Sequence, residues 1–452
     1  MNVAQIRARI DHPIIDSDGH LIEYLPVVRD ILREQAGDAA VTGLDYVTSA
    51  GRFTRGLSVE QMRANAFVRS PWWGLPARNS LDRGTALLPA LLAERLDEIG
   101  IDHAVLYPTY GLVPTNLDDG DLRRAVARAF NTFYAEEFRD HRARLTPVGI
   151  IPMHTPEEAL AEIEYATSLG LDAFMLGGPI LRPTPGLEHR AARWLDTLGV
   201  DSLYDYDPVW KRCAELRIAP TFHTPSMGWA THQSPTSYVY NHIGMFATGG
   251  EAVARSLFLG GVLHRFPTLR FAFLEGGVAW GASLYSGLVG HFEKRNREAV
   301  EHYNPKHLDR TLLIELFGKY GSDRYRARLD QLEDGLRFLS DPDETNLDEF
   351  AASGVASAED IKDWFTERFY FGCEADDPLT AVAFDTDRNP LGARLRPIFA
   401  SDIGHWDVPD VRDVLPEAWE LVEHGHIDEA EFRAFTYENA CALWPKVAAR
   451  LS

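Results

Sequence analysis

Four residues of metal-ligand type stand at the ends of short apolar runs that lie far apart in the sequence. Asp18 and His20 occur in IIDSDGHLIE, His223 in APTFHTP and Asp402 in IFASDIGHWD. Asp18 and His20 are two residues apart, so they would share one face of an extended strand. Two carboxylates and two imidazoles suit Zn²⁺, Fe²⁺ or Mn²⁺ and need no thiolate. The sequence therefore predicts a site for one divalent metal ion.

Each of these residues also has an ordinary structural interpretation. Asp18 could accept backbone hydrogen bonds in a turn before Gly19, and His223 alone could be a hydrogen-bonded core histidine. Asp402 could cap a helix, as could Glu275, which follows the apolar residues of the segment FAFLEGG. Taken together they favour the metal site, because a buried cluster of carboxylates without a cation would be costly.

The elements that must position these residues alternate along the chain. Short apolar runs are separated by long helical patterns such as residues 121–139, 156–169 and 207–216, which is typical of βαβ units. The runs cover residues 14–16, 104–107, 146–151, 173–176, 218–222, 270–274, 369–371 and 397–400. Eight strands alternating with helices predict an α/β fold, a (β/α)₈ TIM barrel with helical insertions. The carboxyl ends of its strands would bring the candidate ligands to one mouth.

Two segments interrupt this alternation, residues 31–92 and 302–365. We predict that both are insertions into a single barrel domain that spans residues 1–452. Insertions after barrel strands lie over the mouth or extend a contact between subunits. We expect a homo-oligomer, namely a dimer.

The composition limits the classes of partner. The 452 residues include 45 Lys and Arg against 67 Asp and Glu, a net charge of −22, and no basic cluster stands out. Neither nucleic acid nor an anionic membrane surface is therefore expected as a partner. Three cysteines far apart provide neither a disulfide framework nor a CxxC site. The chain shows no signal-peptide pattern and no apolar run of about 20 residues, so we expect a cytoplasmic protein acting on a small molecule.

The order of these motifs resembles the amidohydrolase-related family of metal-dependent hydrolases, which also contains the aminocarboxymuconate-semialdehyde and hydroxybenzoate decarboxylases. The resemblance extends over most of the chain and is carried by IIDSDGHLIE, ARAFNTFYAEEF, RLTPVGIIP, PEEALAEIEYATSLGLDAFML, APTFHTP, GVLHRFPTLRFAFLEGGVAW, RPIFASDIGHWD and YENACALW. It implies the barrel fold and a divalent metal ion. It also implies that Asp18 and His20 are the first-strand ligands, His223 the fifth-strand ligand and Asp402 the eighth-strand ligand.

Two positions depart from the pattern of this family. The first ligand is Asp18 rather than His, and the more anionic set favours Mn²⁺ or Fe²⁺ over a His-rich Zn²⁺ site. The decarboxylases of the family carry a catalytic His at the end of strand six, where this chain has Glu275. Without that His, the usual proton donor to the substrate ring carbon is missing, which argues against decarboxylation.

The main hypothesis is therefore a mononuclear metal-dependent hydrolase. Metal-activated water would attack the carbonyl of an amide, an ester, a thioester or a C–C bond beside a carbonyl in an aromatic or apolar acyl substrate. Asp402 or Glu275 would accept the water proton, and His242 or His405 would protonate the leaving group. Both histidines also fit structural roles, since His405 could orient Asp402.

Substrate contacts are predicted from the first insertion and from two strand ends. Arg78, Trp72 and Trp73 could hold a carboxylate and a flat body. Tyr107 follows the second strand and Trp229 the fifth. The competing interpretation is that most of these aromatic residues pack the insertions onto the barrel rim.

Two other functions stay open. One is a metal-dependent, non-oxidative decarboxylase of an aromatic or unsaturated carboxylic acid, which the resemblance supports and the missing His opposes. The other is a metal-stabilised barrel that serves as a binding or structural protein.

Overall fold

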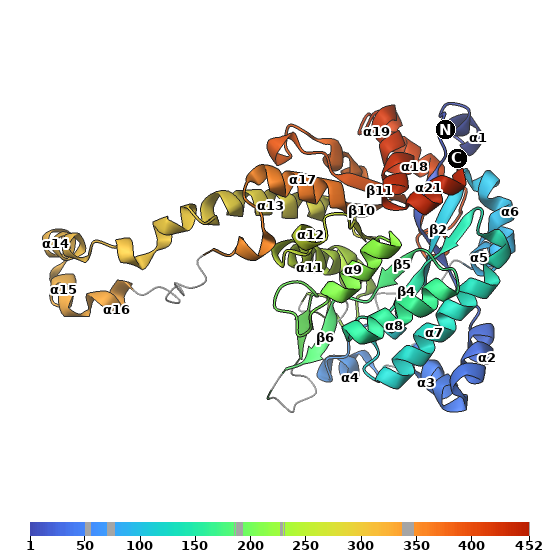
Figure 1. Ribbon diagram of the computed structural model, residues 1–452, viewed down its shortest axis with the longest axis horizontal. Coiled ribbons are helices and arrows are strands. Elements are labelled where there is room, and N and C mark those ends of the chain that lie inside the picture. The colour runs from blue at the N-terminus through green and yellow to red at the C-terminus, as the bar shows by residue number, and fades with distance from the viewer. Residues whose placement is uncertain are drawn as a thin grey trace.

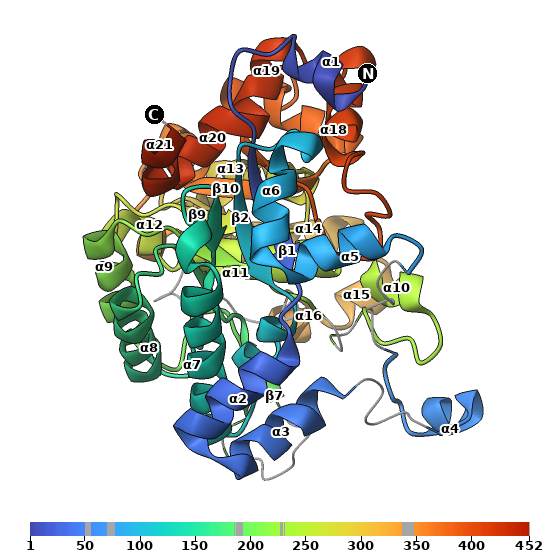
Figure 2. The same ribbon diagram turned by 90° about the vertical axis from the view of Figure 1, so that its right-hand side faces the viewer.

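The computed structural model describes residues 1–49, 56–69, 77–184, 186, 193–226, 229, 231–336 and 348–451. Parallel strands surrounded by helices form the body of the molecule (Figures 1 and 2). In chain order the strands of this body are β1 (Ile15–Leu21), β2 (His103–Pro108), β3 (Leu145–Pro147), β4 (Gly149–Ile151), β5 (Phe174–Leu176), β8 (Pro220–Phe222), β9 (Phe271–Phe273), β10 (Phe369–Glu374) and β11 (Arg396–Ala400). Each of the eight predicted apolar runs overlaps one of these strands, and the third run overlaps both β3 and β4.

The strands follow one another around a closed ring. One sheet has the order β1-β2-β3 and the other the order β11-β10-β9-β8-β5-β4. β3 and β4 are one strand interrupted at Val148, whose backbone N–H donates to the Leu106 carbonyl at 3.0 Å. The ring closes where the Asp402 N–H donates to the Asp18 carbonyl and the His20 N–H to the Ile403 carbonyl, both at 3.1 Å. The predicted (β/α)₈ barrel is confirmed.

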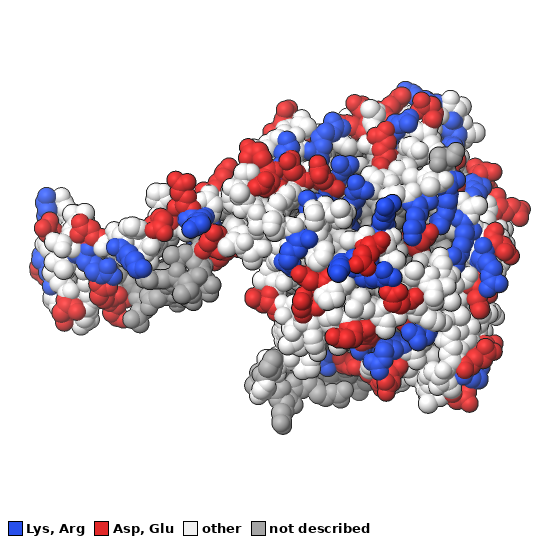
Figure 3. Space-filling view, viewed as in Figure 1, with Lys and Arg blue, Asp and Glu red and all other residues white. Residues whose placement is uncertain are grey.

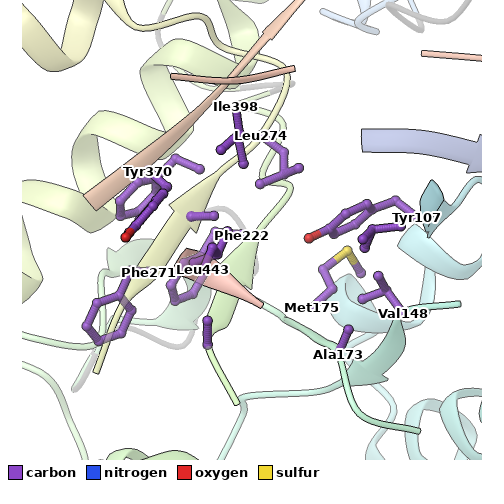
Figure 4. Packing of buried hydrophobic residues seen from close by; sticks show 14 of the residues in the cluster. Tyr107, Val148, Ala173, Met175, Phe222, Phe271, Leu274, Tyr370, Ile398 and Leu443 are labelled. Carbon is purple, nitrogen blue, oxygen red and sulfur yellow. The ribbon is translucent and has the colours of Figure 1, made fainter. Parts of the chain in front are cut away.

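Apolar side chains fill the interior of this ring. Figure 4 shows residues from opposite sides of the barrel, among them Tyr107, Met175, Phe222 and Ile398, converging on the core. The Phe222 ring stacks on that of Phe273 with centroids 5.8 Å apart. Continuous burial on both faces explains why the strands read as unbroken apolar runs rather than as alternating patterns.

The helices of the barrel begin and end where the sequence provides the signals. At the start of α8, the Thr155 hydroxyl accepts a hydrogen bond from the Glu158 N–H at 3.2 Å, and Pro156 occupies the first helical position. The main helices are α6 (Pro89–Ile99), α7 (Gly120–Glu137), α8 (Pro156–Ser168), α9 (Asp207–Leu216), α11 (Met245–Leu259), α13 (Ala279–Arg295), α17 (Ala358–Arg368) and α18 (Val414–Glu423). The three helical patterns named above match α7, α8 and α9 within two residues at each end.

The remaining elements of the body lie outside the ring of strands. Both termini lie at the end opposite α2 and α3 (Figures 1 and 2). These elements are α1 (Val3–Arg7), α2 (Leu25–Ala36), α3 (Asp38–Thr48), α4 (Val59–Ala64), α5 (Ser80–Leu87), α10 (Tyr238–His242), α12 (Val262–Arg265), α19 (Glu429–Arg433), α20 (Asn439–Leu443), α21 (Pro445–Leu451) and the antiparallel hairpin of β6 (Ile180–Pro183) and β7 (Arg193–Asp196).

The two segments that interrupt the sequence pattern differ in how they lie. Within residues 31–92, α2, α3 and α5 lie against the rest of the body, while α4 stands apart from it at the lower right of Figure 2. Within residues 302–365 the helices α14 (Arg310–Tyr320), α15 (Asp323–Arg326) and α16 (Leu332–Leu336) project far from it (Figure 1). None of the described helices has both the length and the apolar character needed to cross a membrane.

Candidate metal centre

The predicted ligands come from separate strands and meet at the carboxyl ends of the barrel. Asp18 and His20 lie within β1, His223 directly follows β8, and Asp402 follows β11 by two residues. All four are buried, with at most 4% of the residue exposed. The fold therefore brings together side chains that are up to 384 residues apart in the sequence.

A bulge in β1 allows Asp18 and His20 to be buried together. The register with β2 shifts between Asp16 and Gly19. A Cβ atom on Gly19 would lie 2.3 Å from a carboxylate oxygen of Asp16, so this position has room for glycine only. Asp16 in turn accepts hydrogen bonds from the backbone N–H of Asp18 at 3.2 Å and from the Ser401 hydroxyl at 2.6 Å, which ties β1 to the segment after β11.

The two predicted histidine ligands face each other through the same type of ring nitrogen. Nε2 of His20 lies 3.2 Å from Nε2 of His223, 3.4 Å from Oδ1 of Asp402 and 3.6 Å from Oδ1 of Asp18. Nδ1 of His20 is 3.3 Å from the Pro108 carbonyl, which can only accept, so the proton belongs on Nδ1 and the lone pair on Nε2. Two nitrogens bound to one tetrahedral ion at about 2.1 Å would be roughly 3.3 Å apart. This pair therefore fits a metal ion.

The carboxylates need a cation as well. Both side-chain oxygens of Asp18 are buried without a hydrogen-bond partner among the described residues. Burial raises the pKa of Asp18 and of Asp402 well above the usual range, and the nearby charges of Glu275 and Glu374 raise both further. In the described part of the chain, no Lys or Arg forms an ion pair with the carboxylates of Asp18, Asp402, Glu275 or Glu374. A divalent ion would supply the missing positive charge.

Glu275 lies against both the predicted ligands and His405. Its Oε2 is 2.8 Å from Nε2 of His223, and its Oε1 is 3.7 Å from Nδ1 of His405. Burial alone would raise the pKa of Glu275, but these two histidines outweigh burial and lower it. The backbone of Glu275 is left-handed at φ 57°, as is that of Asp402 at φ 50°. Left-handed backbone at non-glycine residues is often found at functional sites.

Neither Glu275 nor Asp402 caps a helix, so the ordinary interpretation of these two residues as helix caps is removed. α13 begins after Val278, which makes no side-chain cap, and α18 begins well beyond Asp402 at Val414. Asp18 does not accept the hydrogen bonds of a turn either, because its backbone N–H is bound by Asp16 and its own oxygens are unpaired.

His405 is part of the same cluster. Its ring lies 3.7 Å from the ring of His20, and its Nδ1 is 2.5 Å from Oδ1 of Asp402. Its Nε2 is 3.5 Å from the Thr109 hydroxyl. Burial lowers the pKa of His405, and Glu275 acts in the opposite direction. His20, Asp402 and His405 form one of the side-chain groups close enough to share a metal ion, and Asp18, His20 and His223 form another.

Glu374, the last residue of β10, also belongs to the cluster, and the sequence reasoning missed it. With Glu275 and Asp402 it forms a third group of potential ligands. Burial, Glu275 and Asp407 raise its pKa well above the usual range. The signal was present, because Glu374 directly follows an apolar run, but that run was taken to end at Phe371.

Aromatic side chains stand beside the cluster. The His242 ring stacks on Tyr238 at 5.3 Å, and both meet the Trp406 ring edge-on at 5.5 and 5.4 Å. Phe246 contacts the His223 ring at 4.8 Å. We call Tyr238, His242, Phe246 and Trp406 the aromatic wall. His242 thus lies in this wall and outside the groups of potential metal ligands.

The predicted substrate contacts are scattered. Tyr107 is fully buried, and its hydroxyl donates to Thr221 at 2.8 Å. Its ring lies 6.0 Å from the His223 ring and 6.4 Å from the His20 ring, so it packs against the cluster from inside the barrel. Trp229 is half-buried in the loop after β8, where its backbone N–H donates to the Ser226 carbonyl. Arg78 is exposed in the loop before α5. The predicted contacts Trp72 and Trp73 lie outside the described residues.

Comparison with known sequences identifies the family. Residues 15–309 match the sequence profile of the family described as Amidohydrolase. The chain belongs to this amidohydrolase family. A search of curated proteins found no relative with a significant match. The predicted family is confirmed, and with it the prediction of an enzyme.

Solved structures similar to this amidohydrolase share its fold over nearly the whole chain. An amidohydrolase from Mycobacterium avium subsp. paratuberculosis K-10 has 16% identity and a TM-score of 0.57, over 96% of this chain and 98% of the other. The 5-carboxyvanillate decarboxylase from Sphingomonas paucimobilis has 14% identity and a TM-score of 0.50, over 96% and 99%. A dihydroxybenzoic acid decarboxylase from Polaromonas sp. JS666, with bound manganese and 2-nitroresorcinol, has 16% identity and a TM-score of 0.51, over 96% and 97%.

Proposed function

We propose that this amidohydrolase catalyses the metal-dependent, non-oxidative decarboxylation of an aromatic or unsaturated carboxylic acid. The aromatic wall beside the candidate metal centre carries the proposal. Tyr238 and His242 stack face to face and meet Trp406, the residue after His405, edge-on. Such surfaces hold a planar ring by stacking and edge contacts. The decarboxylases among the similar structures, which act on ring-bearing acids, support this choice of reaction.

The metal ion would be held by Asp18, His20, His223 and Asp402. Their mixture of carboxylates and imidazoles favours Mn²⁺ or Fe²⁺ over Zn²⁺. When bound, a divalent ion offsets the buried carboxylates and polarises an oxygen of the substrate. The chain's own contribution is to keep the two histidine nitrogens and the unpaired oxygens of Asp18 aimed at one point.

Decarboxylation also needs a proton at the carbon that loses the carboxylate. The bond between that carbon and the carboxylate carbon breaks, its electron pair stays on the substrate carbon, and a proton replaces the departing CO₂. Three groups beside the candidate metal centre can carry a proton, namely Asp402, His405 and Glu374. Glu275 in place of the family's strand-six His therefore does not remove the source of the proton.

Hydrolysis of an acyl substrate is the second candidate, and the contact between Glu275 and His223 favours it. In the metal-free protein the histidines beside Glu275, with His223 Nε2 at 2.8 Å, lower its pKa, and a cation bound by His223 would keep the carboxylate anionic in their place. An anionic carboxylate can accept a proton from water. In this reaction Glu275 is the general base.

Product analysis distinguishes the two candidates. The Mn²⁺-loaded protein is incubated in ¹⁸O-labelled water with hydroxybenzoates and, separately, with aryl esters and thioesters. The proposal predicts CO₂ release from an aromatic acid and no ¹⁸O in the aromatic product. Labelled carboxylic acid from an ester, with no CO₂ from any acid, would establish hydrolysis instead. Glu275→Gln should then lower turnover by about 10²-fold or more, while the exposed Asp387→Asn serves as the matched control.

A further inference from the structure

The segment that projects from the barrel carries an unusual amount of uncovered apolar surface. We call residues 296–336 the arm; it extends from α13 and ends in α14, α15 and α16 (Figure 1). No residue of α14 is buried. The large apolar side chains exposed on the arm by 39% to 71% are Tyr303, Leu308, Leu312, Ile314, Leu316, Tyr320 and Tyr325.

This apolar surface is large enough to form an interface. A large side chain that is half exposed leaves on the order of 100 Å² uncovered, so the arm offers roughly 600–700 Å². Two such arms, each covered by an equal area of another chain, would exceed the total of about 1,200 Å² that specific interfaces bury at the low end. Leu312, Leu316 and Tyr320 repeat every four residues and share one face of α14, and exposed apolar surface that is continuous in this way marks interaction sites.

Side-chain contacts at both ends of the arm stabilise its conformation. At its foot Arg295 lies over the Tyr303 ring at 5.3 Å and pairs with Glu349 at 3.6 Å. At its far end Arg310 on α14 pairs with Glu333 on α16 at 2.5 Å. These contacts hold the arm in an extended form, with its apolar side chains directed at solvent in the isolated chain.

A groove at the foot of the arm offers a matching surface. It has a volume of about 680 Å³ and lies between α11 and α13. Apolar residues of its lining are Leu259, Trp280, Leu284, Leu288 and Phe350. On α13, a Cβ atom added to Gly287 would meet no atom within 4 Å, so another helix can approach closely there.

The net charge of the far end of the arm indicates which kind of partner it can bind. Residues 310–336 carry five basic and five acidic side chains, so their net charge is zero, against −22 for the whole chain. Both signs are visible along the arm in Figure 3. A neutral apolar element is not repelled by another copy of this acidic protein, and it offers no positive charge to a nucleic acid or an anionic membrane.

We propose that two copies of this chain form a two-fold dimer in which the arm of each copy lies in the α11–α13 groove of the other. Arm and groove are adjacent on one chain, so one rotation axis makes both contacts at once, as a self-complementary interface requires. This inference is independent of the reaction that the metal centre catalyses.

Measurement of the mass in solution tests the dimer. Light scattering of the full chain at micromolar concentration should give twice the 50.7 kDa of one copy. Leu312→Glu with Leu316→Glu, one turn apart on α14, should give monomers with an unchanged circular dichroism spectrum. Leu81→Glu with Leu379→Glu replaces equally exposed residues on the barrel, and this matched control should stay dimeric. A monomeric wild type, or a dimer that survives both substitutions on the arm, would overturn the proposal.

Two further variants test the groove itself. Gly287→Arg fills open space without a clash inside its own chain, so it should dissociate the dimer while the barrel stays folded. Leu316→Cys with Gly287→Cys should be joined between chains by a short bismaleimide, giving a band of doubled mass, while each single variant should not. A bridge within one chain, or a dimer without any bridge, would refute the groove as the docking site. Sedimentation of a monomeric wild type with phosphatidylcholine vesicles would assign the arm to a membrane instead.

Discussion

Glu23 and Asp18 lie five residues apart, and each is 1% exposed, yet their surroundings differ completely. Glu23 accepts hydrogen bonds from the backbone N–H groups of Tyr110 at 2.8 Å and Gly111 at 3.0 Å and from the Tyr134 hydroxyl at 2.6 Å. Asp18 has no such donor for either side-chain oxygen in the described part of the chain. The protein itself satisfies the first carboxylate and leaves the second for a ligand.

The same contrast separates the other carboxylates at this end of the barrel. Asp16 resembles Glu23, since Ser401 and the Asp18 backbone supply its donors. Asp402 resembles Asp18, with like charges from Glu275 and Glu374 nearby. Burial alone therefore does not distinguish a candidate metal ligand. The missing donors of Asp18 point to one, because an unsatisfied buried charge persists only where something else stabilises it.

Replacing Asp402 should give the largest effect. Asp402→Asn removes the charge of one proposed ligand but keeps its shape, and Asn tolerates the left-handed backbone at this position. We expect metal retention after dialysis to fall by about 100-fold or more, with a comparable loss of activity. Elemental analysis of the purified variant measures this.

The matched control for that experiment is Asp387→Asn, which removes one negative charge from an exposed position between β10 and β11. It should retain metal like the wild type. Without metal, Asp402→Asn should be at least as stable as the wild type, because it relieves repulsion among buried carboxylates. Full metal retention in Asp402→Asn would remove Asp402 from the ligand set.

Replacing Glu23 should lower the stability of the protein and leave its metal affinity nearly unchanged. Glu23→Ala leaves several buried donors without an acceptor, so we expect the free energy of unfolding to fall by about 3–5 kcal/mol. Metal affinity per folded molecule should change little. Urea unfolding measures the first and metal titration the second, with the exposed Glu157→Ala as control. A variant as stable as the wild type would show that these hydrogen bonds do not hold the loop after β2.

The barrel was predictable because its signal is repeated. Each buried strand appears as a short apolar run, and the alternation with helical patterns leaves few other folds. Because the carboxyl ends of barrel strands converge, the sequence also predicts that Asp18, His20, His223 and Asp402 meet at one mouth. The projecting arm was not foreseen as such, since a helical pattern does not show whether a helix packs on its own chain.

Strand ends and side-chain directions limited the prediction of the site. Glu374 was missed because β10 continues three residues beyond the apolar run, as far as Glu374 itself. Tyr107 was expected just after the second strand, but β2 continues to Pro108. Its hydroxyl donates to Thr221, while its ring lies 6.0 Å from the His223 ring and 6.4 Å from the His20 ring. Its role as a substrate contact therefore stays a prediction.

The smallest effect should be the pH dependence of stability that Asp16 alone contributes, and it should follow the same division. In the metal-free protein the pKa of Asp16 is raised to about 6, and burial raises the pKa values of Asp18 and Asp402 still more clearly. The folded state therefore binds more protons than the unfolded state, in which such groups have a pKa of about 3.9. The stabilising contribution is complete below about pH 4 and is lost as the pH rises through the raised pKa values.

Unfolding in urea from pH 5 to 8, with a chelator or with saturating Mn²⁺, checks this sign. Without metal we expect the free energy of unfolding to fall with pH, by about 1.4 kcal/mol per pH unit for each carboxylate while it titrates. Bound Mn²⁺ favours the charged forms of Asp18 and Asp402, so the fall should become smaller by the part due to these two groups. The part due to Asp16, whose donors come from the protein, should remain. Equal slopes with and without Mn²⁺ would mean that the unpaired carboxylates do not face the ion, and the distinction between the two kinds of buried carboxylate would fail.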